Sequence, residues 1–155
     1  MNRYEELLDE AIQEGLYVIE NAPFESSSAG LINGDVIGLN KNLETTTEKA
    51  CVLAEELGHH HTTVGNILDI DIAWNRKQER QARLNGYNRL IGLIRLIEAY
   101  ESGCQSRYEI AQHLDVTEEY LQECIDCYTD KYGVGVSVGD YYVTFIPYLS
   151  VMKLI

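Results

Sequence analysis

The sequence lacks any long hydrophobic run, which argues against a membrane-spanning helix. Its apolar stretch at residues 90–97 contains Gly92 and Arg95 and is far shorter than the roughly 20 residues that a span requires. The N-terminus, Met-Asn-Arg-Tyr-Glu-Glu, has no basic region followed by an apolar one, so it does not resemble a secretory signal. We therefore expect a cytoplasmic protein that does not associate with a membrane.

Positive charge is also scarce. The chain has 12 lysines and arginines against 25 aspartates and glutamates, which gives a net charge of −13. Binding to a nucleic-acid backbone needs local positive charge, and the best basic segment, residues 76–83, includes the acidic Glu79. We therefore do not expect direct binding to nucleic acid.

The four cysteines, at positions 51, 104, 124 and 127, are expected to be reduced in a cytosolic chain. Cys124 and Cys127 have the spacing of a metal or redox pair. However, both fall within a predicted helix, and no second pair completes a tetrahedral metal site. The pattern favours buried thiols on the apolar face of that helix.

The hydrophobic pattern predicts a mixed α+β fold. Asn33-Gly34-Asp35 is a strong hairpin signal, and Thr45 with Glu48 fits a capping box that opens a long helix. In chain order we predict a helix at 4–14, a β-leaning segment at 16–19, strands at 29–32 and 36–40, helices at 46–62, from 72 or 75 to 101, at 107–114 and at 117–132, and a β-hairpin at 134–145.

These elements suggest a core in residues 1–103, with a small antiparallel sheet and two long helices. Residues 104–155 would form a helical appendage and the C-terminal hairpin, as part of the same compact unit.

The first long helix carries the chemistry. Glu55 and His59 are four residues apart, so they lie on one helix face one turn apart, which lets two side chains hold one metal ion. Zinc hydrolases use His-Glu-x-x-His at this spacing, with the glutamate as general base. Here Glu55 replaces the first histidine and can still ligate a metal through oxygen, while Glu56 occupies the position of the base.

A third metal ligand is available on the next helix. Glu79 follows His59 with nineteen residues between them. With Glu55, His59 and Glu79 on the metal, a water molecule would take the open fourth position and Glu56 would accept its proton.

Residues 50–62, Ala-Cys-Val-Leu-Ala-Glu-Glu-Leu-Gly-His-His-His-Thr, resemble the active helix of the ImmA/IrrE family of metallopeptidases. Residues 75–82 resemble that family's second helix, with Glu79 at its ligand position. The resemblance implies a zincin-like fold, a zinc ion, and an endopeptidase of a phage or other mobile element. Its expected substrate is a protein, a helix-turn-helix repressor.

Position 55 departs from the family pattern, in which the first ligand is histidine. With glutamate there, Glu55, Glu56 and Glu79 place three carboxylates close together, which should raise at least one pKa. The same change should weaken zinc relative to a site with two histidines and could favour a harder ion such as manganese. A module of the same fold that binds its partner without cleaving it is therefore the alternative hypothesis.

Two other interpretations compete with these. Glu56 and His60 are also four apart, but that pairing leaves no obvious base. Residues 107–127 resemble a helix-turn-helix, yet the helix in the reading position begins Glu118-Glu119 and carries further acids, where a DNA-reading helix needs basic or amide side chains. We therefore favour a structural or protein-binding role for this region.

Overall fold

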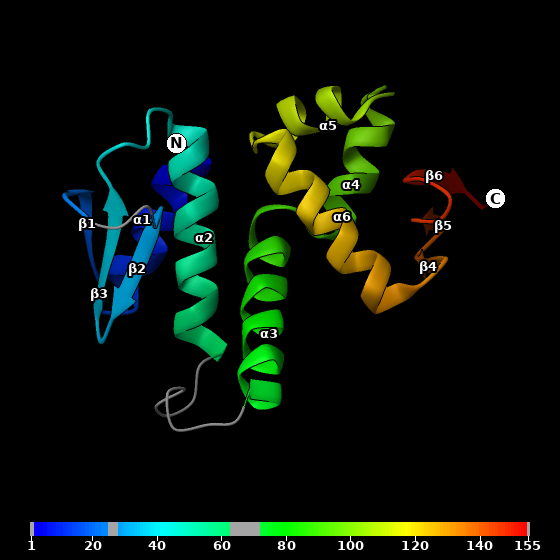
Figure 1. Ribbon diagram of the computed structural model, residues 1–155. Helices are drawn as coiled ribbons and strands as arrows, with labels where there is room; N and C mark the ends of the chain where they lie inside the picture. The colour runs from blue at the N-terminus through cyan, green and yellow to red at the C-terminus, as the bar shows by residue number, and fades with distance from the viewer. Residues whose placement is uncertain (1, 25–27, 63–71, 155) are drawn as a thin grey trace. The chain divides into compact units, whose positions relative to one another are not determined.

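The computed structural model describes residues 2–24, 28–62 and 72–154, with the side chains of residues 72–75 left out (Figure 1). The described residues contain helices and two small sheets, so the predicted α+β class is confirmed. The chain divides into two compact units, Met1–Arg89 and Leu90–Ile155. The boundary expected at residue 103, with both parts in one compact unit, stays a prediction.

The first unit begins with α1 (Arg3–Gln13). The Asn2 side chain caps this helix by accepting a hydrogen bond from the Glu5 N–H at 2.8 Å. Tyr4, Leu7 and Ala11 form its buried face. The helix therefore covers the core with a narrow apolar stripe and leaves its acidic side chains in solvent.

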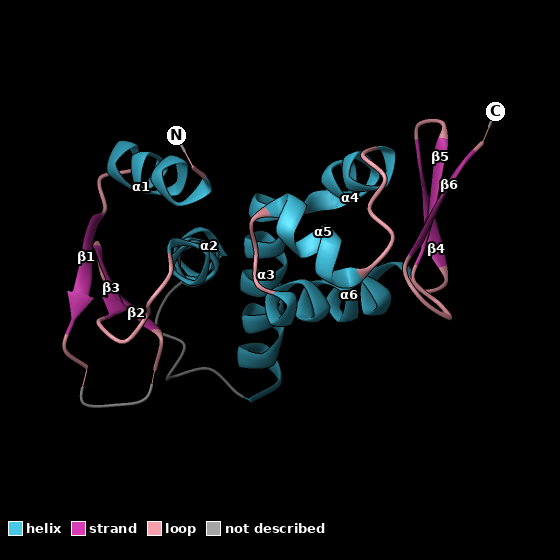
Figure 2. Cartoon of the chain, turned by 90° about the horizontal axis from the view of Figure 1, so that it is seen from above, coloured by secondary structure: helices cyan, strands magenta, loops and turns pink. Residues whose placement is uncertain are grey.

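The sheet of the first unit has the strand order β1-β3-β2, formed by β1 (Tyr17–Ala22), β2 (Gly30–Asn33) and β3 (Val36–Asn40). The predicted hairpin is confirmed: β2 and β3 are antiparallel around Gly34, whose positive φ of 63° suits glycine. The β-leaning segment becomes β1, which pairs with β3 in parallel, so the sheet is mixed rather than antiparallel as predicted. Figure 2 shows α1 and α2 on one side of this sheet.

Helix α2 (Thr46–Thr62) follows, and its predicted capping box is present. The Glu48 N–H donates to Thr45 Oγ1 at 3.0 Å, and the Thr45 N–H donates to Glu48 Oε1 at 3.2 Å. Leu53 and Leu57 are fully buried on the apolar face of the helix. The packing of this face against the core therefore fixes the orientation of α2, and with it the direction of the polar side chains between Leu53 and Leu57.

The prediction of one helix up to residue 101 is wrong. The chain forms α3 (Ile72–Leu90) and α4 (Gly92–Glu101), separated at Ile91. Gly92 has a φ of 70°, a conformation that stops an α-helix and that glycine adopts without strain. The Arg95 guanidinium donates to the Leu90 carbonyl at 3.3 Å, so a carbonyl freed by the break keeps a partner.

The second unit contains α4, α5 (Arg107–Leu114) and α6 (Glu118–Tyr132), followed by a sheet of three strands, β4 (Gly135–Val138), β5 (Tyr141–Thr144) and β6 (Ser150–Lys153). The predicted hairpin corresponds to β4 and β5. Sequence reasoning missed β6, because this short edge strand exposes Met152 and shows little apolar alternation.

The packing of the second unit also tests the cysteine prediction. None of the four cysteines, which all lie in the described part of the chain, forms a disulfide; Cys124 is fully buried in the core beside Tyr128, whereas Cys127 is half-buried. Burial raises the pKa of the Cys124 thiol well above its ordinary value. A neutral, packed thiol at Cys124 agrees with the prediction.

Among the described residues, no helix is both long and apolar enough to cross a membrane.

Candidate functional site

Helices α2 and α3 approach very closely at Gly58. A Cβ atom at this position would lie 2.2 Å from the Ala82 carbonyl oxygen and 3.2 Å from the Gly86 nitrogen. Both neighbours are backbone atoms, so neither can rotate away. Only glycine fits here, and this contact between backbones brings Glu79, one turn before Ala82, next to His59.

The structure brings together the three residues that the sequence suggested as metal ligands. Glu55, His59 and Glu79 are each half-buried, and one ligand atom from each lies within 4.8 Å of the other two. His59 Nε2 is 3.6 Å from Glu79 Oε1. We call Glu55, His59 and Glu79 the inner group.

The inner group fits a divalent metal ion. It offers one imidazole nitrogen and two carboxylate oxygens, a donor set that zinc accepts and that also suits harder ions. Ligands about 2.1 Å from a tetrahedral ion lie roughly 3.5 Å apart, so small rotations of these half-buried side chains would close the set. Arg83, which the sequence reasoning did not include, has its Nε 3.4 Å from Glu79 Oε1 and balances part of its charge.

Glu56 lies beside the inner group but is far more buried, with 8% of its surface exposed. Burial, and then the charges of Glu55 and Glu79, raise the pKa of Glu56 to about 7. The prediction that one carboxylate would have a raised pKa is confirmed, although burial rather than repulsion is the largest cause. A carboxylate with a pKa near neutrality is suited to accept and return a proton.

Gly30 in β2 leaves space for the Glu56 side chain because it has no side chain of its own. The sequence reasoning missed this residue. A Cβ at Gly30 would lie 2.6 Å from Val52 Cγ1 and 3.2 Å from Glu56 Oε1. Strand β2 is at the edge of the sheet, since β3 is its neighbour and the strand order ends there. An edge strand therefore passes directly over the carboxylate of Glu56.

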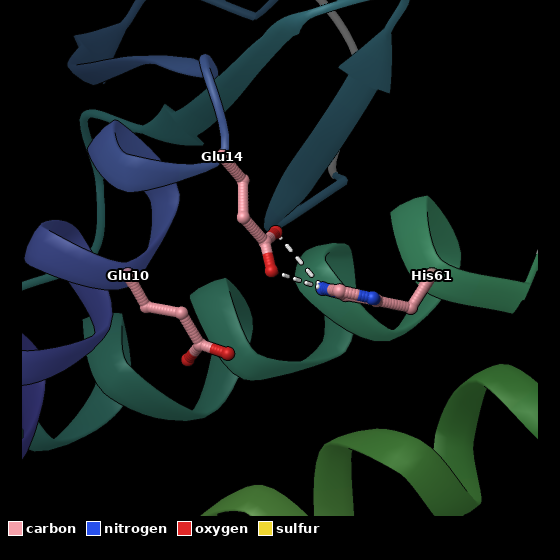
Figure 3. A group of neighbouring side chains, drawn as sticks. All are labelled: Glu10, Glu14 and His61. Atoms are coloured by element: carbon pink, nitrogen blue, oxygen red, sulfur yellow. Dashed lines mark hydrogen bonds and ion pairs between the residues drawn. The ribbon is translucent and has the colours of Figure 1, made fainter.

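A second group of potential ligands is formed by Glu10, Glu14 and His61, which we call the outer group. Figure 3 shows the Glu14 carboxylate facing the His61 ring, with distances of 2.7 and 2.8 Å from its two oxygens to Nε2. The Arg89 guanidinium forms an ion pair with Glu10. Ion pairs within the protein thus account for these charges, and none of the three members of the outer group is buried.

The alternative pairing of Glu56 with His60 finds no support in the geometry. His60 is exposed, and its Nε2 lies 3.9 Å from Glu14 Oε2. Within the described part of the chain, neither group of potential ligands contains Glu56 or His60. His60 therefore belongs beside the outer group.

Comparison with known proteins agrees with this arrangement. The family model described as IrrE N-terminal-like domain, Peptidase_M78, matches residues 13–125, a range that includes Glu55, Glu56, His59 and Glu79. No curated protein matches the chain, and no solved structure does. The match extends over most of the sequence, from the end of α1 into α6. The chain therefore belongs to the Peptidase_M78 family and carries a metallopeptidase-like module with an IrrE N-terminal-like domain.

Proposed function

We propose that this protein is a metallo-endopeptidase that holds one zinc ion with Glu55, His59 and Glu79 and uses Glu56 as its general base. The observation that carries the proposal is a buried carboxylate, Glu56, which lies close enough to Glu55 and Glu79 for their charges to raise its pKa. When bound, the ion would supply a Lewis acid that polarises the peptide carbonyl and acidifies water. Manganese is the alternative ion, because two of the three ligands are carboxylates.

In this mechanism Glu56 moves the proton. Its carboxylate accepts one proton from the attacking water molecule and returns it to the amide nitrogen as the peptide bond breaks, so that one water molecule yields a new carboxyl group and a new amine. The low exposure of Glu56 keeps bulk water from competing for this proton. Gly30 leaves the space in which the Glu56 side chain can turn between the water and the leaving nitrogen.

We further propose that the substrate is a protein, a helix-turn-helix repressor of a phage or mobile element, cleaved in the cytoplasm. The family resemblance of residues 50–62 and 75–82 suggests this partner. Among the described strands, β2 pairs only with β3, and its other edge supports a peptide substrate on physical grounds, because a strand edge presents backbone N–H and C=O groups to which an extended chain can pair. A chain paired with β2 would pass close to Glu56.

The test is co-incubation of the purified protein with the repressor from the same genetic element, followed by intact-mass analysis and a metal assay. We expect one cleavage site, about one metal ion per chain, and a Glu56→Gln variant that keeps its metal but loses cleavage. Glu44→Gln, an exposed acid outside the site, is the matched control. Equal cleavage by wild type and Glu56→Gln would refute the proposed role of Glu56.

The second candidate function is a module that binds its partner without cleavage. The observation that favours it is Glu55, which adds negative charge where the family pattern has a neutral imidazole and so weakens a site tuned for zinc. This function predicts binding of the repressor that survives chelator and Glu56→Gln, with no products at any metal concentration. Cleavage that chelator abolishes and zinc or manganese restores would rule it out.

A further inference from the structure

A groove lies within the second unit, between the helices α5 and α6 and the loop at residues 145–149. Its volume is about 790 Å³, large enough to accommodate several side chains of a partner. One wall is polar and includes Glu118, Gln122 and Asp126 from α6. Another part of the lining, which we call the apolar wall, is mainly apolar and consists of Phe145, Ile146, Pro147, Tyr148 and Leu149.

The apolar wall is unusually open to solvent. Tyr148 is 70% exposed and Ile146 is 48% exposed, and Tyr108 on α5 is 59% exposed at the other side of the groove. Large apolar side chains gathered around a concave surface mark interaction sites more often than isolated ones do. The groove therefore offers apolar contacts that are not used within this unit.

Beside the groove, α6 presents a row of acids. Glu119, Glu123, Asp126 and Asp130 are all exposed, and their spacing of four, three and four residues places them along one helix face. Asp126 belongs both to this row and to the wall of the groove. The row of acids and the groove therefore share Asp126.

The positive charge in the groove is neutralised. Arg107 is the basic residue among its lining residues, and its guanidinium is bonded to Glu118 Oε2 at 3.2 Å and to Gln122 Oε1 at 2.7 Å. Residues 90–155 as a whole carry ten acidic side chains against four basic ones. The surface around the groove is therefore negative, and it attracts a cationic partner.

We propose that the groove, together with the acidic face of α6, is a docking surface for a segment of a partner protein in which basic side chains flank apolar ones. Charge selects this occupant: a second copy of this chain, with its net charge of −13, would be repelled, as would nucleic acid or an anionic membrane. This docking proposal depends on the proposed function only in the choice of partner. The repressor proposed as the substrate binds DNA, so it must carry basic residues to contact phosphates.

Two synthetic helical peptides test this surface on the full-length Glu56→Gln variant, which cannot cleave them by the proposed mechanism. The first contains lysine, alanine and a face of leucines; the second has the same lysines with alanine at every leucine. Fluorescence anisotropy gives the affinities, and amide chemical shifts map the contact. We expect the leucine peptide to bind at least about tenfold more tightly and to shift residues of α6 and the 145–149 loop.

Matched variants separate a docking surface from general attraction to an acidic protein. Glu119→Gln, Glu123→Gln, Asp126→Asn and Asp130→Asn together should weaken binding of the leucine peptide about tenfold. The control variant removes the same number of exposed charges from the first unit, with Glu5→Gln, Asp9→Asn, Asp35→Asn and Glu44→Gln, and should change the affinity less than about twofold. Equal losses in both variants would overturn the proposal.

A single substitution tests the apolar wall independently of charge. Tyr148→Ser should weaken the leucine peptide about tenfold and leave the alanine peptide unchanged, whereas Tyr17→Ser, at an equally exposed tyrosine of the first unit, should change neither. No effect of Tyr148→Ser, with shifts outside the second unit, would refute the site. These measurements do not depend on proteolysis, so a failure of the proposed enzymatic function would be seen separately, in the cleavage assay.

Discussion

The inner and outer groups have the same composition, two glutamates and one histidine, but they differ in what surrounds them. In the inner group the side chains are half-buried and stand beside the buried Glu56. Both groups contain ion pairs, Glu79 with His59 and Arg83 in the inner group and Glu14 with His61 in the outer one, but among the described residues the buried acid is Glu56, which lies near Glu55 and Glu79. The two groups therefore share their ligand chemistry, and the buried Glu56 is the difference on which we base the proposed catalytic centre.

Replacing one histidine in each group gives the strongest test of this comparison. His59→Ala should lose the metal ion and lower kcat/KM by at least about 10³-fold, because the centre then keeps only two ligands. His61→Ala should keep both metal and activity, since it removes only a partly exposed ion pair. Metal content by mass spectrometry and the cleavage rate are the measurements. Loss of metal in His61→Ala would reverse the assignment of the two groups.

The pH dependence of stability tests the burial of Glu56. In the metal-free protein its pKa is raised from 4.5 to about 7. Between these values the unfolded chain releases a proton that the folded chain keeps. The stability that this proton provides is therefore complete below pH 4.5 and is lost as the pH rises through about 7.

Glu56→Gln should remove this loss. In chelator, we expect the variant to gain up to about 3 kcal/mol over wild type between pH 4.5 and pH 8. Urea unfolding at several pH values measures the difference, and Glu14→Gln, in the outer group, serves as the control. Parallel pH profiles for wild type and Glu56→Gln would show that Glu56 is solvated like the outer acids.

Gly58 should tolerate no side chain if the inner group depends on the close crossing of α2 and α3. In an open helix, replacement of glycine by alanine stabilises by about 0.5–1 kcal/mol. Here the new Cβ would meet the Ala82 carbonyl, so we expect Gly58→Ala to destabilise by about 1–3 kcal/mol and to weaken metal binding. Thermal unfolding and metal titration test this. A more stable variant with unchanged metal affinity would contradict the close crossing.

The smallest effect is expected in the outer group. Glu14→Gln removes the ion pair with His61, and exposed pairs of this kind contribute about 0–1 kcal/mol. The free energy of unfolding should therefore change by less than about 1 kcal/mol, and this small change should shrink further at high salt. A loss of several kcal/mol, or a loss of bound metal, would show that the outer group does more than pair charges.

The parts of the fold that could be predicted from sequence depend on neighbouring residues. The capping box at Thr45 and the hairpin at Asn33-Gly34 are local signals, and each element that they predict is present. The inner group was predicted from spacing on one helix together with a family resemblance, and the structure places its three members together.

The parts that could not be predicted depend on segments that are distant in sequence. Gly58 has its role only because Ala82 of another helix lies against it, and Gly30 because Glu56 lies beneath its strand. The parallel pairing of β1 with β3 likewise has no local signature. The break at Gly92 was the exception, since a glycine inside a helical pattern was visible; the continuing apolar periodicity on both sides led to the wrong prediction.

The contact between Gly58 and Ala82 also indicates which sequence intervals carry information in relatives of this protein. The nineteen residues between His59 and Glu79 include the end of α2 and the start of α3, and the close crossing of these helices at Gly58, rather than the length of this interval, determines where Glu79 lies. The short intervals carry this information: Gly58 immediately precedes His59, and Ala82 follows Glu79 by three residues. One residue inserted into either interval would turn a ligand by about 100° around its helix. A search pattern that fixes these two short intervals and leaves the long one free should therefore recover members of the family whose connecting segments differ in length.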